Sequence, residues 1–198
     1  MHFFSINKQI STGLLLLLSL AFSSCGGETD PFPRQYGHPR IDMPKELKYS
    51  KFESASCPFT FEYPAIAEIS RNQPDSCWID VSFPQYNCKW HLSSRGVGDK
   101  GKDRNFRYEE ARKLVFKHIK KTDGNIPEIP IQTKAGYGVK WELYGQVGTP
   151  MEFFFGDENT TIMGSFYFQT ALKNDSLQPV IQFMKKEMDR MITTIEWK

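Results

Sequence analysis

The segment VKWELYGQVGTPMEFFFGDENTTIMGSFYFQ, residues 139–169, contains three runs of apolar and aromatic residues separated by two turn-forming stretches. The turns are GQVGTP at 145–150 and GDENTT at 156–161, and both are rich in glycine and small polar residues. Short connections of this kind join neighbouring antiparallel strands. The segment therefore predicts a three-stranded antiparallel meander.

Three further strands are predicted upstream, where apolar and polar residues alternate with the period of two expected for a half-buried strand. They are FTFEYP at 59–64, CWIDVSF at 77–83 and CKWHLS at 88–93. Only the short stretch PQYN separates the last two segments, so we expect them to lie side by side as antiparallel strands.

Residues 105–122 change to the period of a helix. Asn105 is expected to cap this helix, and Lys120 and Lys121 lie near its negative end. The apolar face consists of Ala111, Leu114, Val115, His118 and Ile119.

A second helix is predicted near the C-terminus, with Asp175 or Ser176 as its cap. Pro179 is tolerated because it falls in the first turn. We interpret the methionines as packing residues of a helix that lies across a sheet. The apolar stripe consists of Leu177, Val180, Ile181, Met184, Met188, Met191, Ile192 and Ile195.

The order of these elements predicts an α+β fold, with an antiparallel sheet of about six strands covered by two main helices. This order is similar to the sandwich of the photosystem protein PsbP and of Mog1-type domains. The similarity is an analogy of pattern and transfers no function.

Aromatic residues lie on both faces of the two strands that end the meander. One face can be core, but the other must be covered by a helix or by a partner protein, and we expect a helix. The residues are Phe153, Phe154, Phe155, Phe166, Tyr167 and Phe168.

Residues 1–24 have the features of a signal peptide, with Lys8 before an apolar stretch that is too short to span a bilayer. Ser23 and Ser24 precede Cys25, and this pattern resembles a bacterial lipobox, in which the cysteine thiol is acylated, for example with palmitate. The alternative is an ordinary signal peptide whose cysteine joins a disulfide.

The sequence thus predicts a signal peptide at 1–24, a lipidated tether and extended segment at 25–44, and a single α+β domain at 45–198. Within the tether, PRIDMP at 39–44 is expected to pack along the domain or to add to the sheet edge of a partner. A lipid on Cys25 would hold the protein on a membrane of the cell envelope, where it is expected to face the periplasm.

The formal net charge is +2 and the basic residues are scattered, which argues against a nucleic-acid partner. Three cysteines follow Cys25, and an odd number leaves at least one thiol unpaired within the chain. We do not expect a bridge between Cys77 and Cys88, because a hairpin there would pair Cys77 with residues well beyond Cys88. The other pairings stay open.

The common catalytic motifs are missing: the sequence has no G-x-S-x-G, no phosphate-binding glycine loop and no H-E-x-x-H. We therefore predict no enzyme activity, no cofactor and no small-molecule ligand. The alternative is a periplasmic ligand-binding or enzymatic domain with a concealed pocket. A pocket that gathers His91, His118 or Asp80 would favour this alternative.

Individual polar residues give weak signals. Cys88 and His91 are metal-ligand types, but they point to opposite faces of a strand, so no metal is predicted. His118 is expected to be a hydrogen-bonded residue at the core or its edge, and Asp80 to be exposed. An acid–base pair of Asp80 and Glu62 would need facing strands and a pocket.

The chain resembles the gliding-motility lipoprotein GldD family of the Bacteroidetes over most of its length, from Pro39 to Lys198. The resemblance rests on PRIDMP, FTFEYP, WIDVSFPQYNCKWHLS, EFFFGD, MGSFYF and NDSLQPVIQFMKKEMDRMITTIEWK, which occur in the family's order. It implies a cell-envelope lipoprotein that is required for gliding and associated with type IX secretion, with no known enzymatic activity.

The resemblance carries over one site residue, the lipidated Cys25, and implies partners among the other gliding and type IX secretion envelope proteins. Cys57 and Cys77 have no place in the family pattern, which argues against a functional disulfide between them. Support of secretion is the expected task.

Asp175-Ser176-Leu177 resembles the Asp-Ser/Thr-apolar acceptor used for O-glycosylation in Bacteroidetes envelope proteins. The alternative is that Ser176 or Asp175 only caps the last helix.

Overall fold

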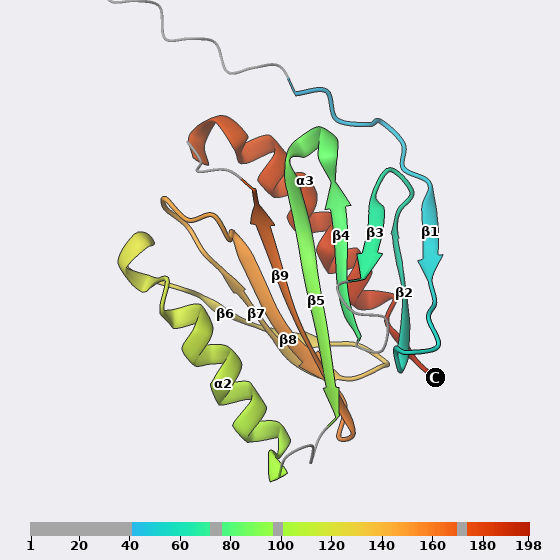
Figure 1. Cartoon of the computed structure of the whole chain (residues 1–198). Coiled ribbons are helices and arrows are strands. Elements are labelled where there is room, and N and C mark those ends of the chain that lie inside the picture. Colours follow the sequence, from blue (N-terminus) through green and yellow to red (C-terminus); the bar gives the residue numbers. More distant parts are fainter. Residues whose placement is uncertain (1–40, 72–76, 97–100, 170–173) are drawn as a thin grey trace, which may run out of the picture. The chain divides into compact units, whose positions relative to one another are not determined.

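The predicted meander forms part of a seven-stranded antiparallel sheet in the computed structural model (Figure 1). The structure describes residues 41–71, 77–96, 101–169 and 174–198, with the backbone alone for 174–176. The predicted signal peptide, Cys25 and most of the predicted tether lie outside these residues. The order across the sheet is β3 (Glu68–Arg71), β4 (Trp78–Phe83), β5 (Cys88–Gly96), β9 (Thr160–Phe168), β8 (Met151–Gly156), β7 (Tyr137–Glu142) and β6 (Glu128–Gln132).

A three-stranded sheet contains the strand predicted from FTFEYP. Its order is β1 (Tyr49–Phe52), β2 (Phe59–Pro64) and β10 (Glu196–Trp197), and both pairings are antiparallel. The α+β prediction is confirmed, but the strands divide into two sheets and outnumber the predicted six. Four strands of two to five residues, β1, β3, β6 and β10, were not predicted.

The two main helices lie on opposite faces of the seven-stranded sheet (Figure 1). Helix α3 (Asn174–Thr193) packs its stripe, including Met184, Met188 and Met191, into the larger core. This core also contains Phe59 and Phe61 from β2, so it joins the two sheets. The prediction that the α3 stripe is core is confirmed. None of the helices in the described ranges has the length and hydropathy of a membrane span.

Helix α2 (Arg104–Phe116) covers the other face through a smaller core that includes Ala111, Val115, Trp141 and Phe154. A helix therefore covers Phe154 on the second aromatic face, as expected, whereas Tyr167 on that face is half-buried and lies outside this core. Asp103 caps α2, because its Oδ1 accepts the N–H of Phe106 at 2.7 Å.

Several details of the two predicted helices are wrong. The structure places the cap of α2 at Asp103 instead of Asn105, and the helix ends at Phe116, before a 3-10 turn at Ile119–Lys121. His118 therefore lies beyond α2. Helix α3 already includes Asp175 and Ser176 within its bounds, so it begins earlier than the predicted caps.

The extended segment before β1 packs on the folded part of the chain. Ile41 and Met43 are partly buried against the larger core. This agrees with the expectation that PRIDMP lies along the domain surface, for the residues of that segment that the structure describes.

Candidate ligand groove beside helix α2

A row of four polar residues crosses the seven-stranded sheet on the face that carries α2. Asp80 on β4 lies opposite His91 on β5. His91 in turn lies opposite Ser165 on β9, which lies opposite Glu152 on β8. Because alternate residues of a strand share a face, this register puts all four on one side of the sheet.

Asp80 is buried, with 6% of its surface exposed, so the prediction that it is solvent-exposed is wrong. Its Oδ2 accepts a hydrogen bond from Lys89 Nζ at 2.8 Å, and its Oδ1 lies 2.6 Å from His91 Nδ1. Burial by itself would raise the pKa of Asp80, but the hydrogen bonds from Lys89 and His91 outweigh burial and lower the pKa. An ionised carboxylate can only accept, so Nδ1 of His91 carries the proton.

Glu152 is also buried, but no cation of the described residues lies as close to it as Lys89 lies to Asp80. The hydroxyl of Ser165 donates to Glu152 Oε2 at 3.3 Å, and His118 Nε2 lies 3.7 Å from Oε1. Burial raises the pKa of Glu152 from 4.5 to about 7. Burial, with the nearby Lys121, lowers the pKa of His118. Both shifts favour the neutral forms, so the two groups are not held together as a strong ion pair.

Helix α2 packs over β7, β8 and β9 and leaves a groove on the β4 and β5 side of this face. The groove consists of two adjoining hollows of about 650 and 670 Å³, which share His91, Leu114 and Met163 in their linings. Leu114 belongs to the apolar face of the predicted helix, but 46% of its surface is exposed because it faces the groove. It stays exposed because the sheet under this part of α2 carries polar residues.

The two hollows differ in character. The row of polar residues lines one hollow together with Lys89, Lys117, His118 and Tyr167. The other hollow, which we call the cationic hollow, lies toward the N-terminal end of α2 and contains Arg95, Lys102, Arg107, Lys113 and Glu110 in its lining. The groove therefore joins a polar half and a positively charged half.

The groove gathers the three residues that would favour a ligand-binding or enzymatic domain, namely Asp80, His91 and His118. Glu62 is not among them, because it lies on β2, where its Oε2 accepts a hydrogen bond from Arg190 at 2.9 Å. The contemplated pair of Asp80 and Glu62 does not form.

A catalytic serine needs a hydrogen bond to its base. Here the hydroxyl of Ser165 donates to Glu152, whereas the hydrogen-bond partner of His91 is Asp80. Asp80 and His91 form a base with its orienting carboxylate, but the described contacts do not connect this base to a nucleophile. The arrangement can hold polar groups of a ligand, and the described residues of the groove form no assembled triad.

The described residues contain no cluster of three or more His, Cys, Asp or Glu side chains placed to hold a metal ion. Cys88 lies in the larger core and His91 faces the groove, so the two point to opposite faces, as the strand pattern predicts. Burial raises the pKa of the Cys88 thiol to about 12, which keeps it protonated and unsuited to metal binding.

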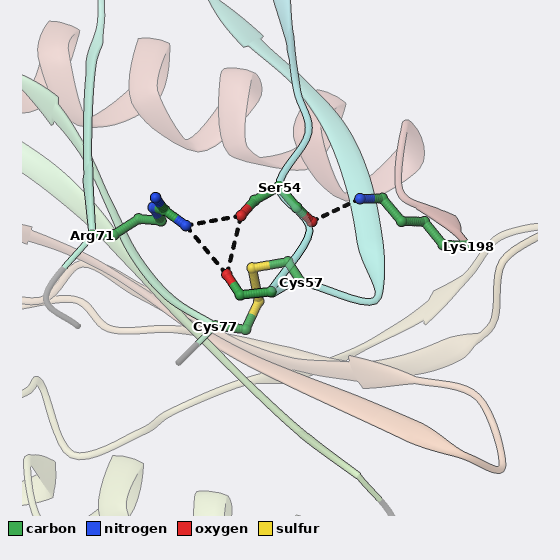
Figure 2. Close-up of a disulfide and its surroundings, with 6 residues drawn as sticks. Ser54, Cys57, Arg71, Cys77 and Lys198 are labelled. Carbon is green, nitrogen blue, oxygen red and sulfur yellow. Dashed lines mark hydrogen bonds between the residues drawn. A yellow bond between two sulfur atoms is a disulfide. The ribbon is translucent and has the colours of Figure 1, made fainter. Parts of the chain in front are cut away.

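Cys57 and Cys77 form a disulfide (Figure 2). The expectation from the family pattern that argued against this bridge is therefore wrong. Cys77 does lie opposite residues beyond Cys88, since its carbonyl accepts the N–H of Ser94 at 3.1 Å. Cys88 is the free, buried cysteine of the described residues.

The disulfide joins the loop after β1 to the residue before β4 and so links the two sheets. Around it, Nη1 of Arg71 donates to the hydroxyl of Ser54 at 3.0 Å, and Nζ of Lys198 donates to the carbonyl of Ser54 at 2.7 Å (Figure 2). These contacts fasten β3 and the C-terminus to the same loop. We interpret the cluster as structural, because its polar groups are used by one another.

Two residues of the polar row, Ser165 and Glu152, were missed by sequence reasoning. Glu152 is a carboxylate inside the apolar run MEFFF, and a charged residue in a buried strand is a usable signal. Of the predicted modification sites, Cys25 and the side chain of Ser176 lie outside the described residues.

Comparison with known proteins gives one family. A family model described as "Gliding motility lipoprotein GldD" matches residues 28–197. No curated protein matches the chain by sequence.

Among solved structures, the chain is similar to the solution structure of cyanobacterial PsbP (CyanoP) from Synechocystis sp. PCC 6803. The TM-score is 0.40 and the sequence identity is 9%, and the match covers 77% of this chain and 94% of that chain. At this TM-score the likeness carries no argument about the function of the groove.

Proposed function

This chain belongs to the gliding motility lipoprotein GldD family, and from this membership we propose that it is a lipid-anchored accessory protein that supports gliding motility and type IX protein secretion. The observation that carries the proposal is the extent of the match, which includes nearly all of the chain after residue 27. The anchor is the lipid on Cys25, after removal of a signal peptide at 1–24. The domain at 45–198 then faces the periplasm and contacts other proteins of the machinery.

The groove beside α2 acts in recognition through its cationic hollow and not in catalysis. The hydrogen bond from Ser165 to Glu152 supports this view, because it directs the hydroxyl away from the Asp80–His91 pair. The groups of the polar row are hydrogen-bonded to one another and to Lys89, so we assign the row a structural part in shaping the groove.

A ligand-binding or enzymatic periplasmic domain is the second candidate. It is favoured by one observation, the gathering of Asp80, His91 and His118 at one hollow. Perturbed pKa values cluster at functional sites, and Glu152 in the same hollow has such a value.

O-glycosylation of Ser176 is a separate proposal that rests on the Asp175-Ser176-Leu177 pattern. The intact mass of native protein tests it. A mass increment of sugar that disappears in a Ser176→Ala variant is expected, and an unmodified native mass would end the idea.

Deletion of the gene tests the accessory role. Loss of a docking component should lower the amount of type IX cargo in the culture medium, and gliding as well in an organism that glides. Rescue by the wild-type gene is the control. Normal secretion and normal movement in the deletion strain would overturn the proposed function.

A further inference from the structure

The cationic hollow concentrates positive charge. Four cations, Arg95, Lys102, Arg107 and Lys113, line it together with one carboxylate, Glu110. The formal net charge of the whole chain is only +2, so this excess is a local feature. An excess of cations in a concave site attracts anions and raises their local concentration.

Glu110 does not neutralise the hollow. Lys102 donates a hydrogen bond to it, and this bond, with the nearby Arg107 and Arg95, lowers the pKa of Glu110. One carboxylate is thus surrounded by three cations. Neither Arg95 nor Lys113 forms an ion pair with a carboxylate of the described residues, so both charges are available to a ligand.

The walls of the same hollow are apolar. Trp78 on β4 has 37% of its surface exposed and Leu114 on α2 has 46%, and both line the hollow. Phe154 and Met163 contribute further apolar lining. Exposed large apolar side chains that gather in a concave site mark a binding surface.

The geometry points to a binding site for a small organic anion in the cationic hollow, with a phosphate or carboxylate group against Arg95 and Lys113 and an apolar group between Trp78 and Leu114. The hollow has a volume of about 650 Å³, which is the size of small-molecule sites. This inference departs from the sequence-based expectation of no small-molecule ligand. It rests on the proposal that the groove acts in recognition.

Phenyl phosphate is a suitable probe because it combines a phosphate with one apolar ring and stays in water. The experiment uses the full lipidated protein in phosphatidylcholine nanodiscs, labelled with 5-fluorotryptophan, and follows the ¹⁹F signal of residue 78. Saturable shifts are expected with phenyl phosphate and with phenylacetate. Inorganic phosphate should bind at least fivefold more weakly, and benzyltrimethylammonium should not shift the signal.

Two variants separate the charged and apolar parts of the site. Arg95→Gln with Lys113→Gln should weaken phenyl phosphate binding at least fivefold, and both residues are exposed, so the fold should persist. Leu114→Ala should weaken phenyl phosphate but leave inorganic phosphate unchanged. Lys134→Gln with Lys186→Gln removes the same charge at exposed positions outside the hollow and should bind as wild type.

Equal binding by the Arg95/Lys113 variant and the wild type would overturn the inference, as would equal binding of the cationic probe. The ¹⁹F signal of residue 78 is also followed in nanodiscs in which phosphatidylglycerol replaces part of the lipid. If its shift is already saturated there without added probe, the hollow binds a lipid headgroup, and this would contradict a soluble ligand. The binding data are independent of the secretion assay, so failure here and failure of the accessory role are distinguishable.

Discussion

Oδ1 of Asp80 lies 2.6 Å from Nδ1 of His91, directly across the β4–β5 pairing. The same carboxylate accepts a hydrogen bond from Lys89, so one buried anion fixes two side chains of the groove. The partners come from the neighbouring strand, and the geometry therefore depends on the register of the hairpin.

Replacing Asp80 with Asn should destabilise the protein by about 1 to 3 kcal/mol at pH 7, because Lys89 loses its buried anionic partner. Because the pKa of Asp80 is lowered, its contribution to the free energy of unfolding is fully present at any pH above the pKa of an ordinary carboxyl group. It is lost as the pH falls through the folded-state pKa. Urea unfolding at several pH values measures the effect, and a difference from wild type that grows toward low pH would contradict the assignment.

Replacing Glu152 with Gln should have the opposite pH dependence. The pKa of Glu152 is raised from 4.5 to about 7, so the folded state holds its proton more tightly than the unfolded state. In the wild type, the contribution of protonated Glu152 to the free energy of unfolding is fully present below pH 4.5. It is lost as the pH rises through about 7. Since one pKa unit corresponds to roughly 1.4 kcal/mol, the variant should gain at most about 3 kcal/mol over wild type at pH 8.

Glu62→Gln is the matched control for Glu152→Gln, because it removes a carboxylate that is exposed and paired with Arg190 on the surface. It should change stability little between pH 4 and pH 8. An equal gain in both variants would show that net charge, and not burial of Glu152, causes the effect.

Reduction of the Cys57–Cys77 disulfide should lower the free energy of unfolding. The cysteines are 20 positions apart, and closing a loop of this length contributes about 3 kcal/mol. Urea midpoints with and without reductant measure the loss. A variant with Cys57→Ala and Cys77→Ala should already be weakened and insensitive to reductant, whereas Cys88→Ala should remain sensitive to it.

The strands that alternate clearly in sequence could be predicted, because alternation and glycine-rich turns are local. The short strands β1, β3, β6 and β10 could not. They have two to five residues, and β6 contains Pro130, so little local pattern marks them. Their pairing comes from the long strands beside them.

The groove was harder to predict than the fold. The alternation of β4 puts Asp80 on the face opposite Ile79 and Val81, but not on a face open to water, because Lys89 and His91 cover it from the next strand. Leu114 lies on the apolar face of its helix and yet is exposed, since helical periodicity does not reveal that polar residues lie beneath it. Both depend on contacts between distant segments.

Replacing Cys25 with Ala should prevent acylation, because only the thiol can accept the lipid. Metabolic labelling with a fatty-acid analogue tests this, with wild-type protein as the positive control. The variant should also leave the membrane fraction. Label that persists on the variant would rule out Cys25 as the acylation site.

A protein that supports secretion as an accessory component and not as an enzyme does not need the acid–base groups of the groove for secretion. The most direct measurement is rescue of the deletion strain by a variant with Asp80→Asn, His91→Ala and His118→Gln. Type IX cargo in the medium is compared with wild-type rescue, while immunoblots and circular dichroism of the purified variant check abundance and folding. An accessory role predicts secretion close to the wild-type rescue, since the loss of a general acid or base lowers rates by roughly 10² to 10⁴ only in an enzyme that uses them. A folded, normally abundant variant that fails to restore secretion would contradict the accessory role.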